Sequence, residues 1–438
     1  MIIINKFGGE IVGTPRLVKL ALKRIKEQLN KKEKPIVVVS ALAGVTDKLK
    51  KLAQLDFKKD KEKIEFFLKK LKKIHLDWME KLEIENSHLK EKLENLNERL
   101  KNDLKKKKTN KLAFEDRILS FGEKWSALLF AQFLNKNGIL AKSFFSDELG
   151  IITDENFGNA NILPKESSKN VKLKLKNFSE IPVITGFIGK TKKGQTTTFG
   201  RGGSDTTACF LGYVFKNAKV ILWKNVAGVL SADPKIVKNP KEIKFLTYKE
   251  AKEAGKIIQG KAINWIEKLK KEIEIAFIVN PKKKTIIKSN LSLEFGIKIL
   301  NFKENLKLFI ISGEKITKPG ALHEISETIS KKGINMVLIR NTKETLYIVI
   351  EKDNYDLENC QKKISSLGYK ITTKDIGMIS AIGKMDWKIV EKFNRYLYQI
   401  SPKAEMGAFP YQNCVRLEAI LAPNEKNKVL SFLHQKLI

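Results

Sequence analysis

The chain has 438 residues, 42% of them hydrophobic, and this length predicts two or three domains at roughly 150 residues each. The net charge of +35 suggests nucleic-acid binding, but only eight of the 84 basic residues are arginine, the lysines are spread along the chain, and no DNA- or RNA-binding motif accompanies them. No run approaches the ~20 apolar residues of a membrane span, and the three cysteines and four histidines lack metal-ligand spacing. We therefore expect a soluble, cytoplasmic protein with no nucleic-acid or membrane partner.

The first 50 residues predict a βαβ unit. A short apolar strand at 2–4 leads into Phe7-Gly8-Gly9, an amphipathic helix follows over 17–29, and a second strand runs from Pro35 to Val39. Such units build a mostly parallel sheet with helices on its faces.

Residues 58–112 are dense in Lys and Glu, with leucines at spacings of three and four. The seam consists of Leu89, Leu93, Leu96, Leu100 and Leu104. This pattern predicts a helical hairpin on the catalytic domain; a separate coiled coil that binds a partner is the alternative.

Between Phe121 and Ala262 the βα pattern returns, and residues 263–305 are expected to close the domain and connect it to the next. After Leu306 the sequence predicts two small modules of strands and helices. The first has a strand at 308–312, a helix at 321–331, a strand at 345–350 and a helix at 357–367. The second has strands at 378–382 and 414–421 and helices at 387–400 and 425–435.

Two glycine- and hydroxyl-rich turns follow predicted strands. In Lys6-Phe7-Gly8-Gly9, the glycines allow close backbone approach to a phosphate and the lysine supplies a positive charge, although such turns are also common without function. Ser40 to Thr46 follows the second strand, at the edge where open α/β sheets bind ligands. Its simpler interpretation is a helix cap.

The segment Gly200-Arg201-Gly202-Gly203-Ser204-Asp205 is the most specific. It presents an arginine and an acid among glycines before a predicted helix at 206–212. The arginine suits a carboxylate bidentately, and the helix start suits an anion.

Together these segments resemble the aspartokinase family. The resemblance rests on KFGG at 6–9, VVVSALAGVT at 37–46, GE and SA at 122–127, TD and FGNA at 153–160, PVITGFIG at 182–189, TTTFGRGGSD at 196–205 and WKNVAGVLSADPKIV at 223–237. It covers nearly the whole chain.

The resemblance implies a three-layer αβα amino-acid-kinase sandwich with a mostly parallel sheet, followed by two ferredoxin-like ACT domains. The expected boundaries are 1–300 for the catalytic domain, with the charged helical arm at 58–112, then 306–375 and 376–438 for the two ACT domains. The implied reaction transfers the γ-phosphoryl group of MgATP to the β-carboxylate of L-aspartate. It is the first step of lysine, threonine and methionine (diaminopimelate) biosynthesis.

Roles follow from the resemblance at matching positions. Lys6 and Asp205 would act at the transferring phosphoryl group, with Asp205 orienting Lys6. The aspartate site would comprise Thr46, Glu123, Arg201, Gly202, Gly203 and Ser204. The ATP site would comprise Lys6, Gly8, Gly9, Ser40, Lys224, Asn225, Leu230, Lys235, Lys256 and Ile257. Magnesium would be held by the phosphates of ATP, with no protein ligand.

The regulatory half resembles a domain that binds lysine or threonine as a feedback effector. The expected effector residues are Gly320, Ala321, Leu322, Asn335, Met336 and Thr342. A homodimer through the ACT domains is expected as well.

One departure from the family lies beside the phosphate-facing glycines, where Glu10 replaces the usual threonine. Glu10 is expected either to face a lysine (Lys224 or Lys256) or magnesium, or to point away into the first turn of the following helix, which we favour. Two alternatives to aspartate kinase stay open at this point: a catalytically weak amino-acid sensor on the same fold, and another kinase of the same superfamily.

Overall fold

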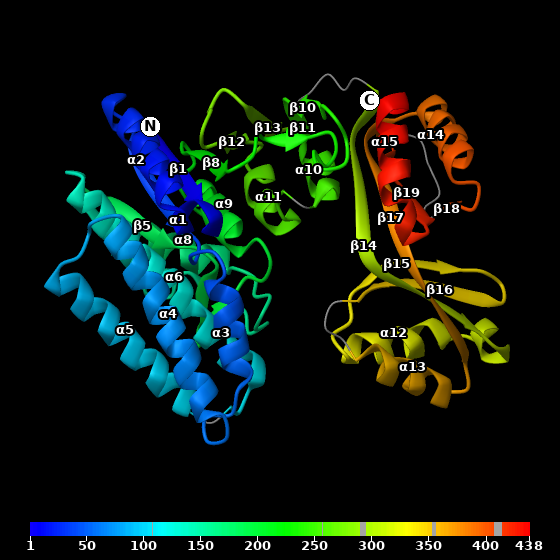
Figure 1. The fold of residues 1–438 in the computed structure, drawn as a ribbon, viewed down its shortest axis with the longest axis horizontal. Coiled ribbons are helices and arrows are strands. Elements are labelled where there is room, and N and C mark those ends of the chain that lie inside the picture. Colours follow the sequence, from blue (N-terminus) through cyan, green and yellow to red (C-terminus); the bar gives the residue numbers. More distant parts are fainter. Residues whose placement is uncertain (107, 256, 290–294, 353–355, 407–413) are drawn as a thin grey trace. The chain divides into compact units, whose positions relative to one another are not determined.

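The computed structural model (Figure 1) describes residues 1–438 except 107, 256, 290–294, 353–355 and 407–413. The chain divides into two compact units. The first comprises residues 1–229 and 242–291, and the second comprises residues 230–241 and 292–438.

The first unit is built on an eight-stranded sheet in the order β11-β13-β12-β8-β1-β2-β5-β3. All its neighbouring strands are parallel except β12 and β13. Its strands are β1 (Ile2–Phe7), β2 (Lys34–Val39), β3 (Ala141–Phe144), β5 (Ile181–Thr185), β8 (Lys219–Lys224), β11 (Phe245–Thr247), β12 (Ile273–Phe277) and β13 (Lys284–Lys288). A smaller sheet contains β4 (Ile152–Thr153), β6 (Ile188–Thr191) and β7 (Thr196–Thr198), and β9 (Val229–Leu230) pairs with β10 (Glu242–Ile243).

Helices cover both faces of the main sheet, and its central strands are therefore buried on both sides. Ile3 and Phe7 of β1 join a large apolar cluster with the helices of one face, while Ile4 between them is equally buried but lies outside that cluster. The helices of that face are α1 (Gly9–Gly13), α2 (Pro15–Asn30), α3 (Val45–Gln54) and α6 (Lys111–Lys136). The remaining helices are α7 (Ser146–Leu149), α8 (Pro164–Lys174), α9 (Gly203–Val214), α10 (Tyr248–Ala254) and α11 (Gly260–Glu267), of which α9 packs on β1, β2 and β8. The expected three-layer α/β/α architecture is confirmed.

The charged segment forms the expected helical hairpin. It consists of α4 (Lys61–Lys81) and α5 (Ser87–Lys105), which lie beside α6 in Figure 1. All five seam leucines of α5 are buried in the same apolar cluster as the sheet. The Trp78 indole of α4 donates a hydrogen bond of 2.6 Å to the carbonyl of Val12. The hairpin is therefore part of the first unit.

The second unit is a six-stranded antiparallel sheet in the order β15-β16-β14-β17-β19-β18. Its elements are β14 (Gly296–Ser312), the 3-10 turn η1 (Glu314–Thr317), α12 (Ala321–Lys331), β15 (Met336–Asn341), β16 (Thr345–Glu351), α13 (Leu357–Ser366), β17 (Lys370–Met385), α14 (Trp387–Ile400), β18 (Glu405–Met406), β19 (Cys414–Leu421), η2 (Pro423–Glu425) and α15 (Lys426–Leu437). Helices α12 and α13 close one apolar cluster with the late part of β14, and α14 and α15 close another with its early part.

The boundary between the units differs from the expected one at residue 300. Leu300 and Phe302 pack with Phe393 and Leu433 in the second unit, so β14 supplies a strand to both of its modules. The first module, expected at 306–375, is thus inserted into the second, which begins before it and continues after it. Residues 230–241, expected in the catalytic domain, also belong to the second unit, because Ala232 and Val237 join this same cluster.

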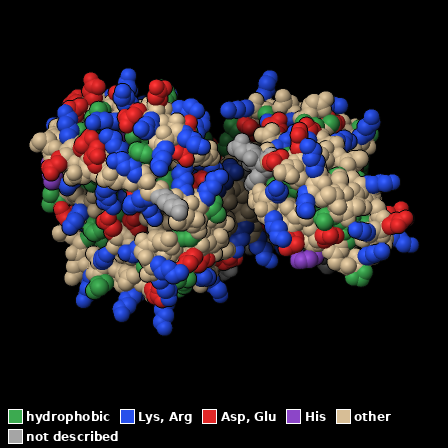
Figure 2. Space-filling view, turned by 90° about the horizontal axis from the view of Figure 1, so that it is seen from below, with side chains coloured by type: hydrophobic (Ala, Val, Ile, Leu, Met, Phe, Trp, Pro, Cys, Tyr) green, Lys and Arg blue, Asp and Glu red, His purple; other side chains and the backbone are tan. Residues whose placement is uncertain are grey.

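The surface carries its positive charge diffusely. Figure 2 shows lysine and arginine side chains over the whole visible face of both units, with acidic side chains between them. Among the described residues, no helix is long and apolar enough to cross a membrane, and no group of His, Cys, Asp or Glu could hold a metal ion.

Candidate active site

The sequence motifs meet at the carboxyl ends of three neighbouring parallel strands. Lys6 lies near the end of β1, Lys224 ends β8, and Ser40 directly follows β2. Since β8, β1 and β2 are adjacent in the sheet, the fold brings these three side chains to one edge.

A buried carboxylate with two ammonium partners forms the centre of the site. Asp205 in the first turn of α9 pairs with Lys6 (Nζ–Oδ1 2.7 Å) and with Lys224 (Nζ–Oδ2 3.3 Å). Burial would raise the pKa of Asp205, but the two ammonium groups outweigh it and hold the pKa below its ordinary value. Burial, and then the neighbouring Lys6, lower the pKa of Lys224. The three groups together carry one net positive charge in a nearly dry environment.

The glycines beside Lys6 permit a close backbone approach. A Cβ at Gly9 would lie 2.6 Å from the carbonyl oxygen of Ala41, so only glycine fits at this position. The amide of Ala43 in turn donates to the Gly9 carbonyl at 3.1 Å. The start of α1 is therefore fixed against the loop that follows β2.

The glycine-rich segment before α9 places two further side chains. Gly202, at φ +73°, caps the helix in the left-handed conformation, which favours glycine. The hydroxyl of Ser40 donates to the hydroxyl of Ser204 at 2.9 Å and links the segment to the loop after β2. Arg201 is exposed and makes no hydrogen bond or ion pair with the described residues, so its guanidinium is available to a ligand.

Glu123 of α6 is a buried acid with one unused oxygen. Its Oε1 accepts a hydrogen bond of 3.2 Å from the amide of Ala41, whereas its Oε2 has no partner among the described residues. Burial raises the pKa of Glu123 to about 8, although the Ala41 hydrogen bond and Lys6 lower it. An orphan carboxylate oxygen of this kind suits an ammonium ligand. Thr46 is half-buried in the first turn of the neighbouring helix α3.

Asp116, also on α6, holds the segment that leads to Arg201, and it was not predicted from the sequence. Its carboxylate accepts hydrogen bonds from the amides of Gly158 and Thr198 at 2.8 and 2.9 Å and from the Thr198 hydroxyl at 2.6 Å. Gly200 and Arg201 follow Thr198 closely in the chain, so Asp116 anchors the strand that delivers them. A single acid within a helical pattern gave no signal of this long-range contact.

Glu10 lies in the first turn of α1 with an exposed side chain, but it does not point away without a partner as expected. Its Oε1 accepts a hydrogen bond of 2.7 Å from the side-chain amide of Asn225, which the sequence did not predict. Glu10 thus ties α1 to the residue that follows β8.

The remaining residues expected to bind the nucleotide make no described contact with Asp205 or its two lysine partners. Leu230 and the exposed Lys235 belong to the second unit. Lys256 lies outside the described residues, and Ile257 is half-buried just before α11. The expected effector residues lie in the second unit: Gly320, Ala321 and Leu322 at the start of α12, and Asn335, Met336 and Thr342 around β15.

This arrangement can bind two differently charged ligands side by side. The Lys6–Asp205–Lys224 cluster, with the glycine turn, suits a phosphate chain, because positive charge and backbone amides converge there. Glu123 and Arg201 suit the ammonium and carboxylate of an amino acid.

Comparison with known proteins supports a kinase. A model of the Amino acid kinase family matches residues 1–276. The chain is 27% identical over 417 residues to the chloroplastic aspartokinase 3 of Arabidopsis thaliana, covering 90% of this chain and 74% of that protein. It is 27% identical over 348 residues to the aspartokinase of Geobacillus stearothermophilus, covering 78% of this chain and 72% of that protein.

Solved structures share the fold. Aspartokinase III of E. coli in complex with aspartate and ADP superposes with a TM-score of 0.84 at 21% identity, covering all of both chains. The same enzyme in complex with lysine and aspartate gives a TM-score of 0.82 at 22% identity, covering all of this chain and 99% of that one.

Proposed function

The chain belongs to the amino acid kinase family, and on that basis we propose that it is an aspartate kinase, which transfers the γ-phosphoryl group of ATP to the β-carboxylate of L-aspartate. The product would be 4-phospho-L-aspartate, the first intermediate on the route to lysine, threonine and methionine. The observation that carries the proposal is the Lys6–Asp205–Lys224 cluster beside a buried carboxylate and a free guanidinium. The curated aspartokinases that this chain resembles support the choice of acceptor.

In the proposed reaction, a β-carboxylate oxygen of aspartate attacks the γ-phosphorus of ATP. A new P–O bond forms to this oxygen, and the bond between the γ-phosphorus and its bridging oxygen breaks, leaving ADP. Lys6 and Lys224 neutralise the charge that develops on the phosphoryl oxygens, and Asp205 holds both lysines in place. No general base is needed, because the attacking carboxylate is already ionised at neutral pH.

We assign the amino-acid end of the substrate to Arg201 and Glu123. Arg201 binds the α-carboxylate through its planar fork, and Glu123 accepts the α-ammonium on its unused oxygen. Thr46, Gly202, Gly203 and Ser204 complete this pocket. Holding both ends of aspartate supplies the positioning on which the transfer depends.

For the nucleotide end we assign Gly8, Gly9, Ser40, Asn225, Lys256 and Ile257 as further contacts, whereas the roles of Leu230 and Lys235 stay predictions from the resemblance. Magnesium would enter with ATP and neutralise its phosphates, coordinated mainly by phosphate oxygens and water. The space beside Gly9, where a Cβ would lie 2.6 Å from the Ala41 carbonyl oxygen, excludes a side chain from this turn, which fits this assignment.

Feedback regulation is assigned to the second unit. Lysine or threonine would bind at residues 320–322, 335–336 and 342, and the unit would also form a homodimer. Two features support the effector site: Gly320 adopts φ +94° at the start of α12, and Ala321 packs in the same cluster as Met336. The fold is shared with an aspartokinase solved in complex with lysine.

The proposal is tested by measuring ADP formation by the purified protein with MgATP and different acceptors. We expect ADP release that depends on L-aspartate and stays near background with L-glutamate or with no acceptor. Equal release with glutamate would assign a different substrate, and release without any acceptor would indicate ATP hydrolysis instead.

The raised pKa of Glu123 predicts a pH-dependent affinity for aspartate. Only the ionised carboxylate can hold an ammonium group, and with a pKa of about 8 most Glu123 is protonated at pH 6. We therefore expect the aspartate KM to rise by about tenfold per pH unit as pH falls from 8 towards 6. Steady-state kinetics with saturating ATP measures this slope, and Glu123→Gln should raise KM and remove the slope.

The same group predicts a stability trend in the absence of substrate. Between pH 4.5 and about 8 the folded protein keeps a proton on Glu123 that the unfolded chain has released. The contribution of Glu123 to the free energy of unfolding therefore falls as pH rises through this window.

In the kinetic experiment, a Glu123→Gln variant whose aspartate KM keeps the full dependence on pH would show that another group titrates.

Glu10→Thr is expected to leave the ATP KM within about threefold and to lower the melting temperature slightly. The substitution removes two contributions to the free energy of unfolding. The hydrogen bond from Asn225 contributes about 0.5–1.5 kcal/mol, and an acid in the first turn of α1 contributes about 0.3–1 kcal/mol. Asn225→Ala, alone and combined with Glu10→Thr, closes a double-mutant cycle that isolates the hydrogen bond. A tenfold loss of activity that excess magnesium restores would instead make Glu10 a metal-organising residue.

A further inference from the structure

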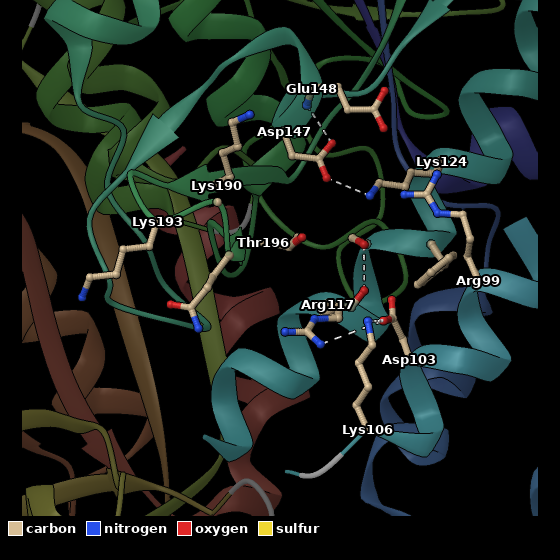
Figure 3. Close-up of a pocket in the computed structure, with 14 residues that line it drawn as sticks. Arg99, Asp103, Lys106, Arg117, Lys124, Asp147, Glu148, Lys190, Lys193 and Thr196 are labelled. Carbon is tan, nitrogen blue, oxygen red and sulfur yellow. Dashed lines mark hydrogen bonds and ion pairs between the residues drawn. The ribbon is translucent and has the colours of Figure 1, made fainter. Parts of the chain in front are cut away.

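The first unit has a charged cavity apart from the candidate active site. None of the residues assigned to aspartate or ATP lines it. Its volume is about 420 Å³, and it is bordered by α5, α6, α7 and the hairpin of β6 and β7 (Figure 3). Glu123 and Lys124 are consecutive on α6 and therefore point about 100° apart. Glu123 reaches the active-site loop at Ala41, whereas Lys124 lines this cavity.

The lining of the cavity is predominantly basic. Six of its side chains are cationic and three are acidic. The cations are Arg99, Lys106, Arg117, Lys124, Lys190 and Lys193. They come from α5, α6 and the β6–β7 hairpin and the residue after α5, so segments distant in sequence converge on one space, as Figure 3 shows.

Lys124 is a buried residue of the cavity lining. Its side chain is only 5% exposed, and its ammonium donates to Asp147 at 2.7 Å. No other hydrogen bond of this ammonium is found among the described residues, although the group carries three donors. The ammonium also lies 5.8 Å and 5.6 Å from the ring centroids of Phe121 and Phe145. Aromatic rings take up none of its N–H donors in ordinary hydrogen bonds, so these donors can serve an acceptor in the cavity.

Two further cations have no carboxylate to neutralise them. Neither Arg99 nor Lys190 makes an ion pair with any described residue. By contrast, Lys106 pairs with Asp103 at 2.6 Å, and Lys193 pairs with Glu155 at 2.8 Å, outside the lining. Arg117 shares Asp103 with Lys106, at 3.9 Å. Among the described residues, Arg99 and Lys190 are thus the lining cations without an ion pair, and Glu148 is the lining acid without one, so the lining keeps a net positive charge.

The remaining lining limits the class of ligand. Phe121 is its one aromatic residue among those described and is 2% exposed, so it offers no face on which a base could stack. A nucleoside is thus disfavoured. We propose that this cavity is a second anion site that binds a small, non-aromatic phosphorylated molecule, with Arg99, Lys124 and Lys190 as its ligands.

The test is calorimetric titration of the full-length protein with inorganic pyrophosphate at constant ionic strength. We expect binding that Arg99→Gln/Lys190→Gln weakens by at least about tenfold, since it removes two charge-assisted contacts. The matched control Lys23→Gln/Lys26→Gln removes the same charge from the exposed face of α2 and should stay within about twofold of wild type. Lys6→Met, which removes a phosphate ligand of the active site, should retain the cavity binding.

Three results would overturn the proposal. An equal loss of pyrophosphate affinity in the α2 control would show that binding depends only on the net charge of the protein. Loss of binding in Lys6→Met but not in Arg99→Gln/Lys190→Gln would place pyrophosphate in the active site. Binding of citrate but not pyrophosphate at matched ionic strength would assign the cavity to carboxylates.

Discussion

Lys6→Met is expected to lower kcat by about 10²–10³ while the chain stays folded, the usual loss when one preorganised group that stabilises transition-state charge is removed. Lys6 lies 2.7 Å from Asp205 with a side chain that is 9% exposed, so its charge acts in a water-poor site. Without it, one ammonium and one carboxylate remain there, and the net positive charge at the phosphoryl group disappears. Steady-state kinetics with saturating ATP and aspartate measures the effect.

The variant also breaks a buried ion pair, so its fold must be checked. Losing one partner of such a pair costs about 3–5 kcal/mol of stability. Circular dichroism and the melting temperature separate unfolding from a catalytic defect, and Lys34→Met on the exposed first residue of β2 is the control. A folded Lys6→Met protein with wild-type kcat would refute the assignment of Lys6 to the transferring group.

Arg201→Lys is expected to raise the aspartate KM by about 10- to 100-fold, because charge-assisted bidentate contacts contribute about 1.5–3 kcal/mol and a lysine cannot reproduce the fork. Arg201 is exposed and follows a glycine at φ +71°, so the substitution disturbs no described packing or ion pair. The ATP KM should change little. Initial rates at varied aspartate and at varied ATP measure the two constants separately.

Equal changes in both KM values would show that Arg201 contacts the phosphates or supports the fold. The exposed Arg16 on α2 offers a matched control, since Arg16→Lys makes the same exchange away from the site. This control should leave both constants unchanged.

Local patterns were sufficient to predict much of the fold. The continuous apolar run at the start of β1, the leucine seam of α5 and the boundaries of α12 and β19 all follow from neighbouring residues in the sequence. The continuity of β14 was not predictable in this way. The early part of β14 is an apolar segment that would fit the core of either unit. Its assignment to the second unit depends on the long-range pairing with β17 and on the packing against α14 and α15.

The candidate site shows the same division. The glycine motifs marked Lys6, Arg201 and Asp205, because glycines beside charged residues are distinctive in sequence. The expected pairing of Asp205 with Lys6 is observed in the structure, whereas their catalytic roles stay predictions. The anchoring by Asp116 and the Glu10–Asn225 contact depend on residues 82 and 215 positions apart, which no local pattern encodes.

The central claim is most directly tested by trapping the product. The acyl phosphate that the account predicts reacts with hydroxylamine, so incubation of the protein with MgATP, L-aspartate and hydroxylamine should yield aspartate β-hydroxamate in step with ADP. Mass spectrometry identifies the hydroxamate, and omission of aspartate should abolish it. ATP binding with no hydroxamate above the enzyme-free control would contradict the account and leave a protein that binds its ligands without transferring phosphate.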